Sequence, residues 1–242
     1  MRKTYHESIF YPSEKKQLLD LCFPLEKKEK KRAFIIPHQD LRKCYKSYQE
    51  VFSHIPDNSR IIALLPLHSE KLLQDSDYIA FESDDKIETP LGTIELEDLG
   101  LKKCHYYREE EYSAELIIPF VQTSCPHSTL ALVYVSAKDA SESKKVAHLI
   151  KRWDNNNTFF IISSNLTGIV ASEDLKKEKE KSISMLENGQ NLLDSYRKGQ
   201  NGICASAIID ALSRVIPGKW RMLVSIDDDT ITGHASFCKE SN

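Results

Sequence analysis

The sequence predicts an α/β protein, with a central, mostly parallel mixed sheet flanked by helices. Short runs rich in Ile, Val, Leu and Phe alternate along the chain with longer amphipathic segments, which is the pattern of a parallel sheet covered by helices. The length of 242 residues also falls in the range of about 200–250 residues in which α/β folds often form one unit with a large core. We therefore expect residues 1–242 to form a single domain.

Apolar runs define the expected strands. The runs that should form the centre of the sheet are too short for helices and are mostly bounded by polar residues. They are Ala33–Ile36, Ile61–Leu65, Leu130–Val135 and Phe159–Ser163. An irregular β segment is expected over Ile87–Glu97. Trp220–Ile226 and Thr230–Phe237 predict an antiparallel hairpin, and Asp227–Asp229 is interpreted as its turn rather than as a cation site.

Amphipathic segments between these strands predict the helices. The expected helices are Leu41–Ser53, Glu111–Gln122, Glu142–Trp153, a highly charged stretch from Glu173 to about Tyr196, and Ile203–Val215. Pro217 and Gly218 end the last of these, because proline cannot continue a helix. The charged run Glu26–Arg32 is interpreted as a solvated connector to the first strand rather than as a patch for phosphate or an acidic partner.

Charge and hydropathy exclude several classes of function. The chain has 33 Lys and Arg against 36 Asp and Glu, a net charge of −3 with neutral histidines, which argues against a nucleic-acid binder with a basic face. The most apolar stretches, Arg60–Leu67 and Thr158–Ile162, are far shorter than the roughly 20 residues of a membrane span. The first residues lack the apolar block of a secretory signal. We therefore expect a cytoplasmic protein that binds neither nucleic acid nor membranes.

The six cysteines lie far apart and form no C-x-x-C pair. Their density is far too low for a disulfide scaffold, so they are interpreted as reduced thiols. They are Cys22, Cys44, Cys104, Cys125, Cys204 and Cys238. This interpretation leaves room for one functional thiol among several structural ones.

No standard nucleotide-binding, serine-hydrolase or zinc motif occurs in the sequence, so position in the fold is the remaining guide. Ligands of open α/β sheets bind outside the carboxyl ends of the strands. His38 directly follows the first predicted strand and His68 the second, so both imidazoles are expected at one edge of the sheet. Each could be a metal ligand, a loop residue or a hydrogen-bonded core histidine.

Further polar residues fall at comparable positions. Cys204 opens a predicted helix, whose free N–H groups would favour a thiolate, although a buried inert cysteine is the alternative. Two imidazoles and a thiolate would suit zinc, copper or iron, with a position left open for water or substrate. Asn165 follows another strand and is either a turn residue or a substrate-facing amide. Glu111 and Glu115 are interpreted as solvated helix-start charges rather than as an acid–base pair.

Seven short motifs run through the chain in an order that is more specific than any one of them. They are Arg2 with Ser8–Pro12, Ile35–His38, Leu65–His68, Thr89–Gly92 with Ile94–Leu96, Glu111–Glu115 with Leu116–Phe120, Ile162–Leu166, and Gly202–Cys204. In this order they resemble the Memo family, also called AmmeMemoRadiSam system protein B, over essentially the whole chain. The resemblance implies a fold akin to class III extradiol dioxygenases.

The same resemblance implies a redox-active iron or copper ion held by His38, His68 and Cys204. The donor types alone also allow zinc. This sequence departs from the family pattern in the cleft at three positions: Asn165 replaces an aspartate, and Gly168 and Tyr112 replace histidines. These changes remove a charge and two candidates for proton transfer or metal binding. A lesser departure is Ala205, which replaces a glycine. Tyr112 and Asn165 are then expected to contact the substrate or to support the metal ligands.

Three functions are compatible with the sequence. The protein could carry out a redox or oxygen-dependent step with iron or copper, or hand the metal on. It could be a degenerate member that binds a small molecule or a phosphopeptide in the same cleft without turnover. It could also act beside a radical SAM enzyme and an AMMECR-type protein, which are encoded with many relatives. Dioxygenase activity does not follow from a likeness of fold alone.

Overall fold

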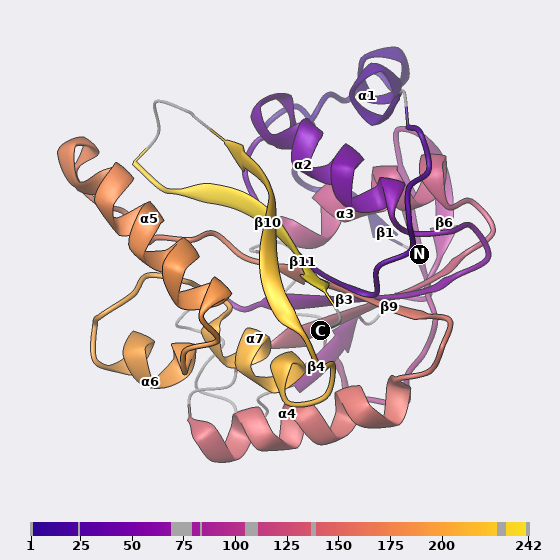
Figure 1. Cartoon of the computed structure of the whole chain (residues 1–242). Coiled ribbons are helices and arrows are strands. Elements are labelled where there is room, and N and C mark those ends of the chain that lie inside the picture. The colour runs from indigo at the N-terminus through magenta and orange to yellow at the C-terminus, as the bar shows by residue number, and fades with distance from the viewer. Residues whose placement is uncertain are drawn as a thin grey trace.

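The fold is taken from a computed structural model, which describes residues 2–23, 25–68, 79–82, 84–104, 111–136, 139–226 and 231–240. Its centre is an eight-stranded twisted sheet (Figure 1). In spatial order the strands are β10 (Lys219–Ile226), β11 (His234–Glu240), β2 (Ala33–Ile36), β9 (Thr158–Ser163), β3 (Arg60–Pro66), β8 (Thr129–Val135), β4 (Ile79–Glu82) and β7 (Lys103–Cys104).

The four middle strands, β2, β9, β3 and β8, are parallel and almost entirely buried. Strands β11 and β4 flank them in the antiparallel direction. Burial on both faces explains why these strands are continuous apolar runs in the sequence rather than alternating ones. The predicted α/β class and the predicted central strands are confirmed.

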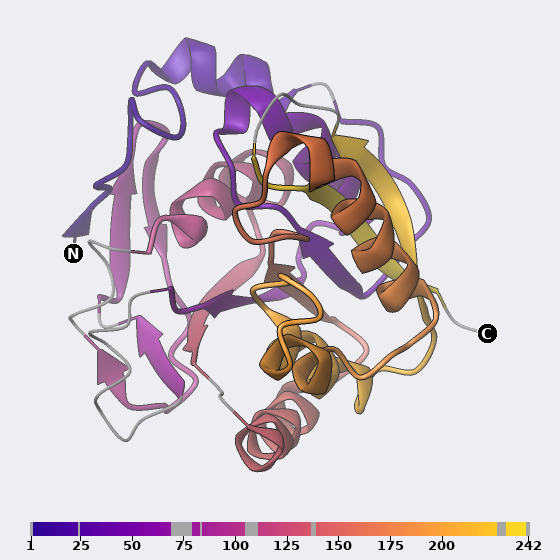
Figure 2. The same cartoon turned by 90° about the vertical axis from the view of Figure 1, so that its left-hand side faces the viewer.

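Two layers of helices cover the two faces of the sheet (Figures 1 and 2). One layer contains α1 (Lys15–Cys22), α2 (Leu41–Ser53) and α3 (Ser113–Ser124); the other contains α4 (Ala140–Trp153), α5 (Ser172–Glu187), α6 (Leu192–Arg197) and α7 (Ser206–Ser213). Successive strand residues supply the two cores in turn, because side chains alternate between the faces. Phe34 and Ile36 pack with the first layer, and Ala33 and Ile35 with the second.

Two predicted helices differ from the structure by more than two residues at an end, whereas α3 and α4 differ by at most two. The charged stretch from Glu173 to about Tyr196 is not one helix, because α5 ends at Glu187 and α6 begins at Leu192. Gly189, with φ +65°, takes the left-handed conformation that ends α5, and the Asn191 side chain accepts a hydrogen bond from Asp194 N to cap α6. The last predicted helix, Ile203–Val215, is shorter in the structure, where α7 spans Ser206–Ser213.

The remaining β structure agrees with the sequence in part, because the short strands β1 (Arg2–Lys3), β4 and β7 were not predicted. Strands β10 and β11 form the predicted antiparallel hairpin, although the predicted turn Asp227–Asp229 lies outside the described residues. The irregular segment Ile87–Glu97 corresponds to the strands β5 (Lys86–Thr89) and β6 (Gly92–Glu95), which form a small separate sheet with β1. No helix among the described residues combines the length and hydropathy that a membrane span requires.

Candidate metal centre

Three side chains from distant parts of the sequence meet at the carboxyl edge of the sheet. His38 follows β2, His68 follows β3, and Cys204 lies in the turn before α7. Each offers one ligand atom, and these atoms lie within 4.8 Å of one another. His38 Nε2 is 3.8 Å from Cys204 Sγ, and the centroids of the two imidazole rings are 4.7 Å apart. The structure thus brings together the three residues that the sequence nominated as ligands.

The donor set and its spacing fit a single transition-metal ion. Metal–nitrogen and metal–sulfur bonds of about 2.0 and 2.3 Å at a tetrahedral angle put the two donor atoms roughly 3.5 Å apart. The separation of 3.8 Å between His38 Nε2 and Cys204 Sγ is close to that value. Imidazole and thiolate donors suit copper, zinc and iron better than hard cations such as magnesium or calcium. The cluster could therefore hold a metal of this group.

Neighbouring polar groups fix the orientation of His38. Its Nδ1 lies 2.8 Å from the hydroxyl of buried Ser163, which leaves Nε2 directed toward Cys204. Its backbone N–H donates to Asn165 Oδ1 at 3.1 Å, and its carbonyl accepts from the Tyr112 hydroxyl at 3.1 Å. Partners of this kind hold metal-binding imidazoles in one orientation in known metal sites.

A buried carboxylate holds His68. His68 Nδ1 lies 2.7 Å from Glu111 Oε2, and the other carboxylate oxygen of Glu111 accepts a hydrogen bond from Ser113 N. Burial raises the pKa of Glu111, but the hydrogen bond and charge of His68 outweigh this effect and keep the pKa below its usual value. Burial lowers the pKa of His68, whereas Cys204 and Glu111 raise it to about 10. An ionised carboxylate can only accept hydrogen bonds, so the N–H at His68 Nδ1 donates to the Glu111 carboxylate.

Glu111 corrects an expectation from the sequence. It was interpreted as a solvated charge on a helix, but it lies before α3 and is only 2% exposed. Its contact with His68 joins residues 43 positions apart, so no local pattern of charges could reveal it. The only signal in the sequence is the Glu111–Glu115 motif that belongs to the family resemblance.

The groups around Cys204, rather than a helix, favour the thiolate form of its side chain. Burial raises the pKa of the thiol, but the imidazoles of His38 and His68 lower it well below the usual value. The backbone N–H of Asn165 also donates to Sγ at 3.2 Å. The prediction that Cys204 opens the helix is wrong, because α7 starts two residues later with Ala205 as its N-cap.

Asn165 and Tyr112 contact the candidate ligands directly. The side-chain oxygen of Asn165 accepts from the His38 backbone N–H, and the backbone N–H of Asn165 donates to Cys204 Sγ, so neither contact needs a charged side chain. The Tyr112 ring stacks on Phe10, with 3.8 Å between ring centroids, and its hydroxyl is bound to the His38 carbonyl. Both residues therefore support the cluster in this structure. Their expected contact with a substrate stays a prediction.

Glu115 anchors the N-terminal segment beside the cluster. This residue is 1% exposed, not solvated as the sequence suggested, and it accepts hydrogen bonds from Tyr5 N, His6 N and the Tyr11 hydroxyl at 2.9–3.0 Å. These contacts hold the segment that carries Phe10 against Tyr112. The carboxylate thus links the first residues of the chain to the support of His38.

Replacing Glu115 by Gln is expected to lower the free energy of unfolding by roughly 2–4 kcal/mol, because an amide group would face N–H donors that now bind a buried carboxylate. Urea unfolding measures the change. The matched control is Glu180→Gln, at an exposed position on α5. Equal stability of the two variants would contradict the anchoring role of Glu115.

A close contact between two backbones positions Cys204. A Cβ atom at Gly202 would lie 2.2 Å from Gly168 N and 3.0 Å from the carbonyl carbon of Thr167. Backbone atoms cannot move aside as a flexible side chain can. Only glycine therefore fits at this position, two residues before Cys204.

Gly202→Ala is expected to lower the free energy of unfolding by about 1–3 kcal/mol and to displace the turn that carries Cys204. Gly168→Ala is the matched control, because a Cβ atom there would meet no atom within 4 Å. Thermal unfolding of the two variants tests the contact. A Gly202→Ala protein as stable as Gly168→Ala would show that the two backbones can separate at little cost.

Fold and site together define a class: an α/β protein with a candidate His–His–Cys metal centre at the carboxyl edge of a mostly parallel sheet. A family model described as "Memo-like protein" matches residues 2–216. The chain therefore belongs to the Memo-like family, as its motifs predicted.

Individual relatives agree with this membership. A MEMO1 family protein of Aquifex aeolicus is 29% identical over 199 residues, which cover 74% of this chain and 71% of the relative. Among solved structures, an uncharacterized protein of Escherichia coli K12 matches 87% of this chain and 100% of its own chain, with a TM-score of 0.51 and 8% identity. At that identity the second likeness supports the fold alone.

Proposed function

We propose that the protein is a redox protein that holds one iron or copper ion between His38, His68 and Cys204. The observation that carries the proposal is the closeness of the three ligand atoms, which lie within 4.8 Å of one another. Zinc would suit the same donors but does not change its oxidation state, so the redox role depends on iron or copper.

The residues of the chain would set the properties of the centre. Ser163 and Glu111 hold the imidazoles through Nδ1, and the charges of Glu111 and Cys204 offset that of a cation. Three protein ligands leave a coordination position for water or substrate. When bound there, iron or copper would supply one-electron chemistry, including reactions with dioxygen.

Anaerobic loading with Cu(I), removal of unbound metal and admission of air test this function. We expect an electron paramagnetic resonance signal of protein-bound Cu(II) that disappears on addition of ascorbate and returns with air. Cys204→Ser, treated in the same way, should give no protein-bound signal. The redox role would be wrong if the loaded protein kept its oxidation state through these cycles and an Fe(II)-loaded sample did likewise.

A binding role without turnover is the second candidate. It is favoured by the departures from the family pattern, because Asn165 carries no charge and the Tyr112 hydroxyl is already bound to the His38 carbonyl. Such a protein would bind a small molecule or a phosphopeptide in the cleft and show no redox cycling. Association with a radical SAM enzyme or an AMMECR-type protein would be compatible with either role and stays a prediction.

A further inference from the structure

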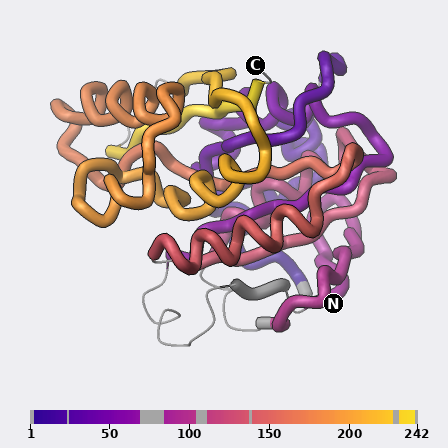
Figure 3. The backbone as a smooth tube through the Cα atoms, turned by 60° about the horizontal axis from the view of Figure 1, so that its bottom comes forward, coloured from indigo at the N-terminus to yellow at the C-terminus, as the bar shows by residue number. Residues whose placement is uncertain are grey.

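A groove of about 380 Å³ adjoins the candidate metal centre at Cys204. It lies between the carboxyl ends of β3 and β8 on one side and α6 and α7 on the other. Helix α7 packs between α6 and α4, which crosses in front of the sheet in Figure 3. Among the described residues that line this groove, Cys204 is the one candidate metal ligand.

Most of the groove wall is apolar. The apolar lining residues are Pro66, Leu67, Val135, Leu193, Ala205, Ala207 and Ile208. A volume of this size is at the lower end of the range of roughly 300–1,000 Å³ that holds small organic ligands. The wall therefore suits the apolar body of a small molecule.

Arg197 gives the groove one charged end. This exposed residue ends α6, and its side chain forms no hydrogen bond or ion pair with another residue in the described part of the chain. Asp139 interacts with Arg197 through charge, but its carboxylate accepts hydrogen bonds from Ser141 N and Glu142 N as the cap of α4. Arg197 thus has its donors available for a ligand.

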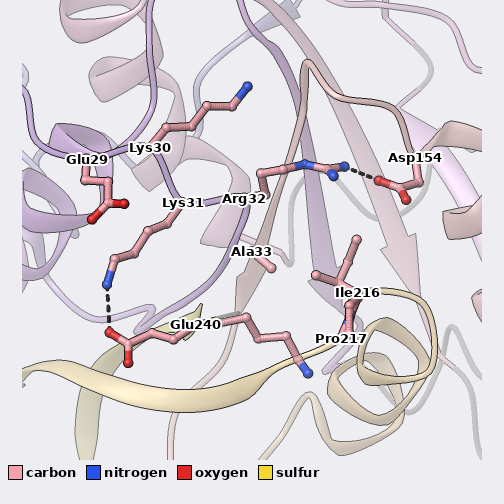
Figure 4. Close-up of a pocket in the computed structure, with 10 residues that line it drawn as sticks. Glu29, Lys30, Lys31, Arg32, Ala33, Asp154, Ile216, Pro217 and Glu240 are labelled. Atoms are coloured by element: carbon pink, nitrogen blue, oxygen red, sulfur yellow. Dashed lines mark hydrogen bonds and ion pairs between the residues drawn. The ribbon is translucent and has the colours of Figure 1, made fainter. Parts of the chain in front are cut away.

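A larger hollow, of about 610 Å³, lies at the amino-terminal end of β2 and contains more cations, each of which is hydrogen-bonded or paired within the chain (Figure 4). Lys30 and Lys239 donate to the backbone carbonyls of Asn156 and Gly218. Lys31 pairs with Glu240 at 2.8 Å, and Arg32 pairs with Asp154. These contacts also agree with the interpretation of Glu26–Arg32 as a connector. The groove beside Cys204 differs, because Arg197, the one cation among its described lining residues, interacts with Asp139 through charge alone and forms no hydrogen bond or close ion pair there.

We propose that this groove binds an organic carboxylate with an apolar body as the substrate of the metal centre. The carboxylate pairs with the Arg197 guanidinium, which suits two-pronged hydrogen bonding to two oxygens. The apolar body lies against Leu193 and Ile208 and places the far end of the molecule beside Cys204. The role as substrate rests on the proposed redox function, whereas binding in the groove requires no metal.

Binding of phenylacetate, phenylpropionate and phenylbutyrate to the metal-free protein tests the proposal, with the corresponding neutral amides as matched ligands. We expect at least one acid to bind about tenfold more tightly than its amide, since a hydrogen-bonded charge pair contributes that much. Titration calorimetry gives the affinities. Nuclear magnetic resonance of the Leu193 and Ile208 methyl groups places the ligand in the groove.

Arg197→Gln is expected to abolish the preference for the acids and leave binding of the amides unchanged. Arg152→Gln, at an exposed position on α4 away from the groove, should behave like the parent protein. The proposal is overturned if no acid binds better than its amide, or if the preference survives in Arg197→Gln. Acid binding through Arg197 in a protein that takes up no metal would refute the redox function and keep the carboxylate site.

Discussion

Replacing Cys204 by Ser is expected to lower the affinity for Cu(I) or Fe(II) by more than about a hundredfold. The thiolate is the soft donor of the cluster, and a serine hydroxyl stays protonated near neutral pH. The variant should keep its fold, because Cys204 lies in a turn and serine has nearly the same shape. Competition with a chromogenic chelator measures the affinity of both proteins.

Cys125→Ser is the control for this substitution. Cys125 is also free and is buried, but its Sγ contacts Lys27 Nζ at 3.8 Å instead of an imidazole. The Cys125→Ser variant should bind metal with the affinity of the parent protein. Unchanged affinity in Cys204→Ser, or an equal loss in Cys125→Ser, would contradict the assignment of Cys204 as a ligand.

Glu111→Gln has the second largest expected effect, a loss of about 10–100-fold in metal affinity. The carboxylate binds His68 Nδ1 at 2.7 Å, so it orients the ring and makes its other nitrogen a better donor. A glutamine keeps the size of the side chain but loses the charge. Chelator competition again gives the affinity.

Glu115→Gln is a matched comparison for Glu111→Gln, because both carboxylates are buried and lie four residues apart. Glu115 binds the N-terminal segment and contacts no candidate ligand through the hydrogen bonds described above. The Glu115→Gln substitution should lower the free energy of unfolding, while the affinity for metal stays within a few-fold of that of the parent protein. Equal losses of affinity in the two variants would mean that Glu111 acts only through general stability.

The strands could be predicted because their signal is local. β2 has the same bounds in sequence and structure, and β3, β8 and β9 differ by at most one residue at an end. Continuous apolar runs between polar residues are enough to identify strands that are buried on both faces. The order of strands along the chain then placed His38 and His68 at one edge of the sheet.

Other features depend on contacts that the sequence does not reveal. The break between α5 and α6 requires the left-handed conformation of Gly189, inside a charged stretch whose periodicity continues on both sides. The burial of Glu115 depends on Tyr5 and His6, about 110 positions away. The environment of Cys204 comes from two distant imidazoles and not from the adjacent helix, so the expected reason for a thiolate was wrong although the residue was well chosen.

The departures from the family pattern have different structural consequences. Asn165 keeps contacts to both His38 and Cys204 that need no charge. Gly168 has open space around the position of a Cβ atom, so the structure leaves room for a side chain there. The altered residues therefore leave the arrangement of the three candidate ligands in place.

Anomalous X-ray scattering from a crystal loaded anaerobically with copper or iron tests most directly whether His38, His68 and Cys204 hold the metal. The account predicts one strong peak at the absorption edge of the metal, within about 2.0–2.4 Å of His38 Nε2, a nitrogen of His68 and Cys204 Sγ. A metal-loaded crystal whose peak lies elsewhere, or that has no peak between these three atoms, would contradict it.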